Sequence, residues 1–211
     1  MDKLIIIGAG GHCRSVVDSL DKTKFELIGF IDGHKKGTHM DLPIFSDKIE
    51  DIENYKSYKY FVAIGDAYFR KKRFEEIKSK GLETINIIDK TAIVSKTVKM
   101  GEGNYIGKLA VINAYAELGD NNIINTKALV EHCCKIGSHN HISTNATING
   151  DVILEDEIFF GSCAVSNGQL KIGSRSVIGS GSVVIKDIES DVTAVGVPAK
   201  VIKRRSLNEQ N

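Results

Sequence analysis

Residues 100–184 carry a large apolar side chain at almost every sixth position. Fourteen of the 15 positions counted in sixes from Met100 to Val184 are Val, Ile, Leu, Met or Phe, although these types make up only 66 of the 211 residues. Glycine follows this position seven times. Small residues recur four places after it: Ala110, Ala116, Ala128, Cys134, Ala146, Ala164, Ser176 and Ser182. Neither the helix period nor the strand period sustains a repeat of six, so each unit is predicted to be a short strand followed by a turn.

Three such units make a triangular coil of 18 residues, and successive coils stack at the strand spacing of about 4.8 Å. The large residue points inward on each face, and the small residue fits where the corner narrows. The repeat therefore predicts a parallel β-helix in which each residue lies above the one 18 positions before it. An ordinary β-sandwich would not keep this register over residues 100–184.

Residues 1–89 follow a different pattern, in which strands alternate with helices. Strands are expected at 4–7, 25–31, 59–64 and 83–88, and helices after the glycine-rich segment 8–11 and over 69–80. This alternation predicts a small, mostly parallel, Rossmann-like α/β domain over residues 1–89, followed by the β-helix over 90–211. The basic helix at 70–80 is predicted to present a solvated face.

Composition narrows the functional classes. A net charge of +1 argues against a nucleic-acid partner. No apolar run approaches the roughly 20 residues needed to span a bilayer. The first residues do not have the pattern of a signal peptide, and the four cysteines show no disulfide-framework spacing. We therefore expect a cytoplasmic protein without a membrane span.

Two further segments accompany the repeat: Gly8-Ala9-Gly10-Gly11-His12 near the start and Gly196-Val197-Pro198-Ala199-Lys200-Val201-Ile202 near the end. Together the three features resemble the hexapeptide-repeat bacterial sugar acetyltransferases, which include UDP-4-amino-sugar N-acetyltransferases and sialic acid O-acetyltransferases. The resemblance covers essentially the whole chain. It implies a left-handed β-helix, against the usual right-handed crossover preference, with acetyl-CoA as co-substrate, no metal, and a homotrimer with active sites between subunits.

The function implied by this resemblance is acetyl transfer from acetyl-CoA to the amino group of a UDP-4-amino-4,6-dideoxy-sugar. O-acetylation of a sialic acid is the alternative within the family. A more distant alternative is an NAD-dependent oxidoreductase that uses the N-terminal glycines. That alternative leaves the whole repeat unexplained.

Acetyl transfer needs a base for the attacking group and donors for the oxyanion, and histidine is the natural base near neutral pH. His132 lies two residues past the inward Val130, where the chain turns and side chains face outward. In the resembled family, an Asn-Thr pair followed by an acidic residue, His and Cys carries the base. Asn125-Thr126 and Glu131-His132-Cys133-Cys134 match it, so Asn125, Glu131 and His132 are predicted catalytic residues. Several relatives carry an acid where Cys133 stands, and whether Glu131 orients the imidazole stays open.

The other predicted catalytic and coenzyme A contacts lie along the repeat. His141 precedes the inward Ile142 and lies half a coil from His132, so the two can meet only across a subunit boundary. We expect His141 to position the acetyl carbonyl, although a polar surface role is an alternative. Gly150 should stack above His132 and offer its amide to the oxyanion. The remaining predicted contacts are Gly161, Gly179, Lys186 and Pro198, the glycines serving either as a track for the pantetheine arm or as turn residues.

The N-terminal glycine segment joins a strand to a helix, an arrangement that binds phosphate through free backbone amides. The dinucleotide motif G-x-G-x-x-G would require glycine at position 13, which is Cys13. The segment therefore indicates a nucleotide-sugar pocket rather than a nicotinamide site. Its predicted residues are Gly8, Gly10, Gly11, His12, Asp32, Gly65 and Asp66, although His12 has the alternative of a simple helix-start residue.

A zinc site is the alternative for the cluster His132, Cys133, Cys134, His139 and His141. Cys134 occupies an inward position of the repeat, and the spacing lacks the paired ligands of structural zinc sites. No metal is therefore predicted.

Overall fold

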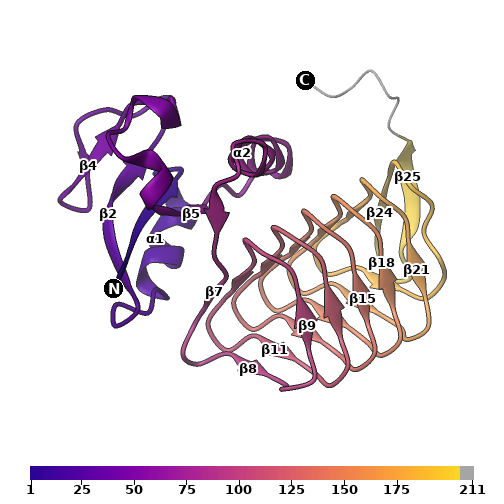
Figure 1. The fold of residues 1–211 in the computed structure, drawn as a ribbon. Coiled ribbons are helices and arrows are strands. Elements are labelled where there is room, and N and C mark those ends of the chain that lie inside the picture. The colour runs from indigo at the N-terminus through magenta and orange to yellow at the C-terminus, as the bar shows by residue number, and fades with distance from the viewer. Residues whose placement is uncertain (205–211) are drawn as a thin grey trace.

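The computed structural model describes residues 1–204. An α/β domain stands beside the first coils of a triangular solenoid, and helix α2 (Ala67–Ser79) lies over the junction between them (Figure 1). Residues 205–211 of the predicted tail lie outside the described residues. None of the described helices has the length and apolar character that a membrane crossing requires.

The α/β domain is built around β1 (Asp2–Ile7), which pairs in parallel with β2 and β5. Leu4–Ile7 are at most 1% exposed, because this strand is covered on both faces as its continuous apolar run predicted. The described sheet has the order β3-β4-β2-β1-β5-β6. Its other elements are α1 (Gly11–Asp18), β2 (Phe25–Ile31), β3 (Thr38–His39), β4 (Leu42–Phe45), η1 (Ile49–Asp51), η2 (Tyr55–Ser57), β5 (Lys59–Val62) and β6 (Glu83–Thr84).

The strand predicted over 83–88 is two strands. β6 pairs with β5 in the α/β sheet, whereas β7 (Ile87–Ile88) pairs with β10 and is the first strand of the β-helix. Asn86 separates them, and its Oδ1 already accepts a hydrogen bond from the Asn104 amide one coil later at 2.8 Å. The chain therefore enters the first coil at Asn86.

The β-helix has three faces of stacked parallel strands, and each strand is paired with the one 18 residues away, as the repeat predicted. The inward positions from Ile106 to Val184 are 5% exposed or less. The first face contains β7, β10 (Tyr105–Ile106), β13 (Ile123–Ile124), β16 (His141–Ile142), β19 (Phe159–Phe160), β22 (Val177–Ile178), β24 (Val192–Val195) and the antiparallel β25 (Lys200–Arg204). The second contains β8 (Ile93–Val94), β11 (Val111–Ile112), β14 (Leu129–Val130), β17 (Thr147–Ile148), β20 (Val165–Ser166) and β23 (Val183–Val184). The third contains β9 (Lys99–Met100), β12 (Glu117–Leu118), β15 (Lys135–Ile136), β18 (Ile153–Leu154) and β21 (Lys171–Ile172).

The corners use left-handed backbone at every sixth residue, mostly without glycine. The non-glycine residues at this sixth position, all with φ between +56° and +63°, are Leu109, Tyr115, Asn121, Lys127, Cys133, His139, Asn145, Asp151, Glu157, Cys163, Gln169 and Arg175. This conformation costs an L-residue roughly 1–2 kcal/mol, which the stacked coils offset. It also makes corner residues 18 positions apart equivalent in geometry.

A ladder of asparagines, buried except for the half-buried first member, runs along the corner that leads into the first face. Its members are Asn86, Asn104, Asn122 and Asn140. Each Oδ1 accepts from the backbone amide 18 residues later at 2.8–2.9 Å, and each Nδ2 donates to a carbonyl oxygen of the following coil. The amides are satisfied inside the protein, as buried polar groups require, and they fix the register of four successive coils.

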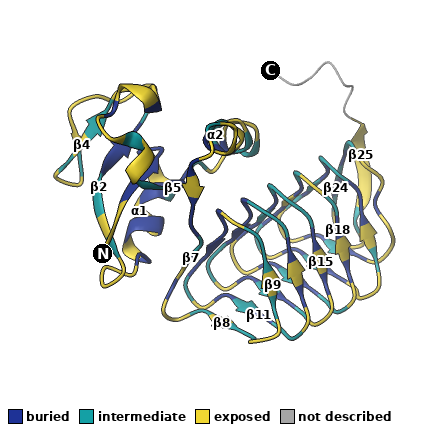
Figure 2. Cartoon of the chain, in the orientation of Figure 1, coloured by how far each residue is buried: buried dark blue, intermediate teal, exposed yellow. Residues whose placement is uncertain are grey.

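The three outer surfaces of the β-helix differ in character (Figure 2). The third face carries mainly charged outward residues, Lys99, Glu117, Lys135 and Lys171. The first face is covered near its start by the α/β domain, where Ile87, Tyr105 and Ile123 are buried. The second face is exposed or half-buried and uncharged, with Ile93, Val111, Leu129, Thr147, Val165 and Val183 pointing outward.

Candidate active site

His132 lies at the corner between β14 and β15, and its side chain is exposed. The imidazole rests against Gly150 in the next coil. A Cβ on Gly150 would fall 2.6 Å from His132 Cε1 and 2.8 Å from Nε2, too close for any side chain. The stack predicted from the 18-residue spacing is therefore present, and glycine at position 150 is what makes room for the ring.

The two carboxylates near His132 make different contacts. Glu131 Oε2 accepts a hydrogen bond from the His132 backbone amide at 3.1 Å, so this carboxylate is engaged at the backbone. Asp151, on the next coil, places its Oδ2 4.0 Å from His132 Nδ1. The sequence prediction overlooked Asp151. The same 18-residue count that placed Gly150 above His132 places Asp151 above Cys133, and this signal could have found it.

The histidine–cysteine cluster separates in the structure. Cys134 is fully buried, its Sγ lies 3.1 Å from the Asn149 carbonyl, and burial raises the pKa of its thiol to about 11. His141 lies on the first face and His132 at a corner of the opposite side. Within the described residues, a different trio of exposed groups has donor atoms within 4.8 Å of one another: His132, Cys133 and Asp151.

His141 begins β16, where the first face meets the α/β domain. Its Nε2 lies 3.3 Å from Asn125 Nδ2, and its ring packs edge-on against Phe159 at 5.2 Å. Its Nδ1 is buried and has no hydrogen-bond partner within residues 1–204. Burial, followed by the charges of Arg70 and His12, lowers the pKa of His141 to about 3. The ring is therefore neutral at ordinary pH. Asn125, which the sequence placed with His132, contacts His141 instead.

His12 approaches the same region from the first turn of α1. Its ring packs edge-on against Tyr105 at 5.2 Å, and its Nε2 is buried without a hydrogen-bond partner in the described chain. Burial, and then the charge of Arg70, lowers the pKa of His12 to about 4. Two neutral imidazoles, one from each domain, thus each bring an unpaired ring nitrogen to the domain junction. Such nitrogens can bind the hydroxyl or amide groups of a ligand.

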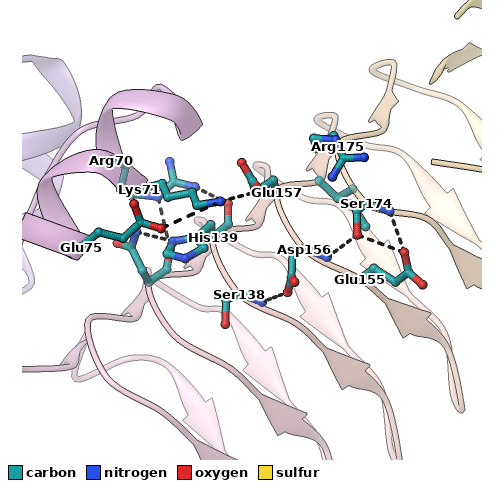
Figure 3. Close-up of polar contacts among 12 residues, drawn as sticks. Arg70, Lys71, Glu75, Ser138, His139, Glu155, Asp156, Glu157, Ser174 and Arg175 are labelled. Carbon is teal, nitrogen blue, oxygen red and sulfur yellow. Dashed lines mark hydrogen bonds and ion pairs between the residues drawn. The ribbon is translucent and has the colours of Figure 1, made fainter. Parts of the chain in front are cut away.

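Arg70 on α2 forms hydrogen bonds to the backbone of both domains at this junction (Figure 3). The guanidinium is 1% exposed, and burial lowers its pKa to about 10. Its five N–H groups donate to backbone carbonyl oxygens at 2.7–3.3 Å, those of Ile64, Gly65, Asn121, His139 and Asn140. The prediction of a solvated helix face is therefore wrong for this residue. Its neighbour Lys71 also bridges the two domains, because its Nζ donates a hydrogen bond to Glu157 Oε1 at 2.8 Å.

The glycine segment follows β1 and leads into α1. A Cβ on Gly10 or Gly11 would meet no heavy atom within 4 Å, so space is open beside both. Gly8 has φ +102°, a conformation that favours glycine. The predicted ligand-binding residue Asp32 holds this segment in place, because its Oδ2 accepts from the Ala9 amide at 2.8 Å.

The second oxygen of Asp32 is also engaged. Its Oδ1 accepts from the amides of His34 and Lys35 at 2.9 and 3.0 Å. Burial raises the pKa of Asp32, but these three backbone hydrogen bonds outweigh burial and the net pKa is lowered. Asp32 therefore organises the loop from within.

Gly65 and Asp66 lie at the end of β5 and the start of α2. A Cβ on Gly65 would meet no heavy atom within 4 Å, and the Gly65 carbonyl oxygen accepts a hydrogen bond from Arg70 at 2.9 Å. Asp66 caps α2, accepting from the Phe69 amide at 3.0 Å. Gly65 therefore faces open space at the junction that contains His12 and His141, whereas the Asp66 carboxylate is used at the helix start.

The predicted coenzyme A residues lie toward the C-terminal coils. A Cβ on Gly161 would fall 2.6 Å from the Ile178 carbonyl oxygen, and one on Gly179 2.6 Å from Val195 Cγ1. Both glycines are therefore needed for contact between coils. Lys186 is exposed, and so is Pro198 in the turn between β24 and β25, where Val197–Pro198 is cis.

Residues 3–77 match the family model described as the PglD N-terminal domain. Two solved structures are similar over nearly the entire chain. The acetyltransferase domain of PglB from Neisseria gonorrhoeae FA1090 is 30% identical with a TM-score of 0.91, covering 96% of this chain and 100% of that one. PerB from Caulobacter crescentus, in complex with CoA and GDP-perosamine, is 32% identical with a TM-score of 0.90, covering 96% and 98%.

Curated proteins match over shorter segments. Galactoside O-acetyltransferase of Escherichia coli (strain K12) is 42% identical over 60 residues, 28% of this chain and 29% of that protein. A protein of Acanthamoeba polyphaga mimivirus is 34% identical over 102 residues, 48% of this chain and 20% of that protein. The matched segments thus span less than a third of the length of either relative. The likeness to the acetyltransferase domain of PglB and to PerB extends over nearly the whole chain and includes both the β-helix and the N-terminal domain. The chain therefore belongs to the left-handed β-helix, hexapeptide-repeat bacterial sugar acetyltransferases, which use acetyl-CoA.

Proposed function

We propose that this protein transfers the acetyl group of acetyl-CoA to the amino group of a nucleotide-linked 4-amino-4,6-dideoxy-sugar, with His132 as the base. The observation that carries the proposal is the stack of the exposed His132 imidazole on Gly150, which brings the ring beside the backbone of the next coil. The likeness to PerB, whose structure contains CoA and GDP-perosamine, supports the class of substrate.

The chemistry is a direct transfer. The acceptor nitrogen attacks the thioester carbonyl carbon, the new C–N bond forms, and the C–S bond breaks. His132 takes the proton from the nitrogen and returns it to the departing CoA sulfur, which leaves as the thiol. The backbone amide of Gly150 is the proposed donor to the oxyanion.

The acceptor is bound where the two domains meet. The proposed acceptor domain is residues 1–89 and the proposed acetyl-transfer domain is residues 90–211, although β7 at the end of the first range already pairs as the first strand of the β-helix. The glycine segment receives the diphosphate at the start of α1, and His12 supplies its unpaired Nε2 to the sugar side of the ligand. The reaction takes place in the cytoplasm.

The second face of the β-helix supports a homotrimer. Its outward residues are uncharged along the whole described solenoid, unlike the mainly charged third face, and a surface of this kind is typical of subunit contacts. His132 borders this face and His141 lies on another, so an active site that uses both needs two copies of the chain. We expect Leu129→Lys to give an inactive monomer by sedimentation and activity assay. A fully active monomer would contradict the trimer.

The identity of the acceptor is tested by measuring the free thiol that is released from acetyl-CoA in the presence of each of three candidate acceptors. These are a UDP-4-amino-4,6-dideoxy-sugar, GDP-perosamine and a sialic acid. We expect turnover with a nucleotide-linked amino sugar, the UDP form first. Turnover with sialic acid alone would replace N-acetylation by O-acetylation. Thermal stabilisation by NAD and not by acetyl-CoA would remove the acetyltransferase proposal altogether.

A further inference from the structure

The carboxylate beside the ring of His132 comes from the next coil and not from its sequence neighbour. Asp151 Oδ2 lies 4.0 Å from His132 Nδ1. Glu131, by contrast, uses its carboxylate to accept the His132 backbone amide. Of these two acids, only Asp151 faces the imidazole.

The backbone holds Asp151 in this place. Asp151 is a corner residue with φ +60°, directly above Cys133, which has φ +59°. Its amide donates to the His132 carbonyl oxygen at 3.0 Å, so the main chains of the two residues are already joined across the coils. The solenoid therefore fixes the backbone from which the carboxylate extends toward the ring.

Gly150 limits the freedom of the ring on another side. The imidazole lies against the Gly150 backbone, and the Asp151 carboxylate lies 4.0 Å from its Nδ1. Catalytic hydrogen bonds are often long in the unliganded state and shorten when the substrate binds. Cys133 in the same turn places its Sγ within 4.8 Å of the ring nitrogen of His132 and of the Asp151 carboxylate.

We propose that Asp151 is the positioning residue for His132. It accepts a hydrogen bond from Nδ1–H, and this selects the tautomer whose Nε2 carries the free electron pair. A base needs that pair to take a proton from the acceptor amine, as in other histidines oriented by a carboxylate. This inference rests on the proposed role of His132 as the base.

The test compares Asp151→Asn with Glu131→Gln in the full-length protein. Protein labelled with ¹⁵N in histidine reports the tautomer of the His132 ring by NMR, with His132→Gln identifying its signals. We expect Asp151→Asn to lose the bias toward Nδ1–H and to lower kcat roughly 10–100-fold, the usual effect of removing a group that orients a functional histidine. The KM for acetyl-CoA and the melting temperature should stay unchanged, and Glu131→Gln should keep the wild-type tautomer.

A rescue separates positioning from structure. In the Asp151→Asn background, Cys133→Asp introduces an acid beside the same ring, at a corner where Asp tolerates left-handed backbone. We expect it to restore part of the tautomer bias and of kcat. An Asp151→Asn protein with wild-type tautomer and kcat would overturn the inference, and so would a loss seen with Glu131→Gln instead. If the wild-type protein transfers no acetyl group, the proposed function fails, while the tautomer measurement still decides whether Asp151 orients the ring.

Discussion

The two histidine regions of this molecule differ in almost every physical respect. His132 stands at an exposed corner of the β-helix, resting on Gly150. His12 and His141 are held between the domains, and burial makes both neutral at ordinary pH, with pKa values lowered to about 4 and about 3. A base must meet solvent and exchange protons, whereas a binding pocket must present fixed hydrogen-bonding groups. The difference supports the proposal that His132 transfers the proton and that the junction binds the acceptor.

Removing the corner histidine should have the largest effect. We expect His132→Ala to lower kcat by roughly 10²–10⁴-fold, the contribution of a well-placed base, with an unchanged circular dichroism spectrum because the side chain is exposed. The exposed His34 provides the matched control, His34→Ala. Near-normal turnover in the His132 variant would remove it from the mechanism.

Displacing the same ring without removing it should have the next largest effect. In Gly150→Ala the new methyl group meets His132 Cε1 at 2.6 Å, so the imidazole must move. We expect a roughly 10–100-fold lower kcat, because misplaced catalytic groups lose rate steeply. Gly33→Ala is the control, since its Cβ would meet Asp47 at 3.4 Å, an ordinary contact. If Gly150→Ala is as active as this control, the stack has no catalytic role.

A substitution at the domain junction should change substrate binding and not the rate of the chemical step. We expect His141→Ala to raise the KM for the nucleotide-sugar about 10-fold, the value of one lost hydrogen bond, with the KM for acetyl-CoA unchanged. Initial rates with each substrate varied in turn measure both constants. A rise in the acetyl-CoA KM instead would place His141 beside the thioester, as the sequence predicted, and would blur the division between the two regions.

The smallest effect is a dependence of stability on pH. His12 and His141 have lowered pKa values in the folded protein, so below pH 6.5, the ordinary pKa of histidine, only the unfolded chain takes up their protons. The free energy of unfolding is therefore not reduced by these two rings above pH 6.5. Below it, the free energy of unfolding falls toward pH 4 by about 1.4 kcal/mol per pH unit for each ring. Urea unfolding at pH 6.5 and 5 measures this slope. His12→Asn should reduce it, and an unchanged slope would contradict the buried, neutral state of His12.

The sequence predicted the β-helix more completely than it predicted the site. The six-residue repeat sets the inward positions, and counting in eighteens places Gly150 over His132. The same count places Asp151 near the ring, whereas proximity in sequence favours Glu131 as the orienting acid. Periodicity did not assign Asn125, however, which contacts His141 and not His132 although all three residues lie on the solenoid.

The domain junction could not be predicted in this way. The approach of His12 to the region of His141 depends on how the α/β domain turns against the coils after β6, and no repeat encodes that angle. Arg70 lies in a helix rich in Lys and Arg, where nothing local distinguishes the buried guanidinium from its exposed neighbours. Its burial results from five carbonyl oxygens contributed by two domains.

The asparagine ladder has a consequence for how such a chain can change in length. Inserting or deleting a single hexapeptide would preserve the alternation of inward and outward residues, yet it would turn every later residue onto a neighbouring face. An asparagine would then stand below a backbone amide that it no longer matches, and His141 would leave the face that meets the α/β domain. Only whole coils of 18 residues keep both arrangements, so viable insertions and deletions should come in that unit.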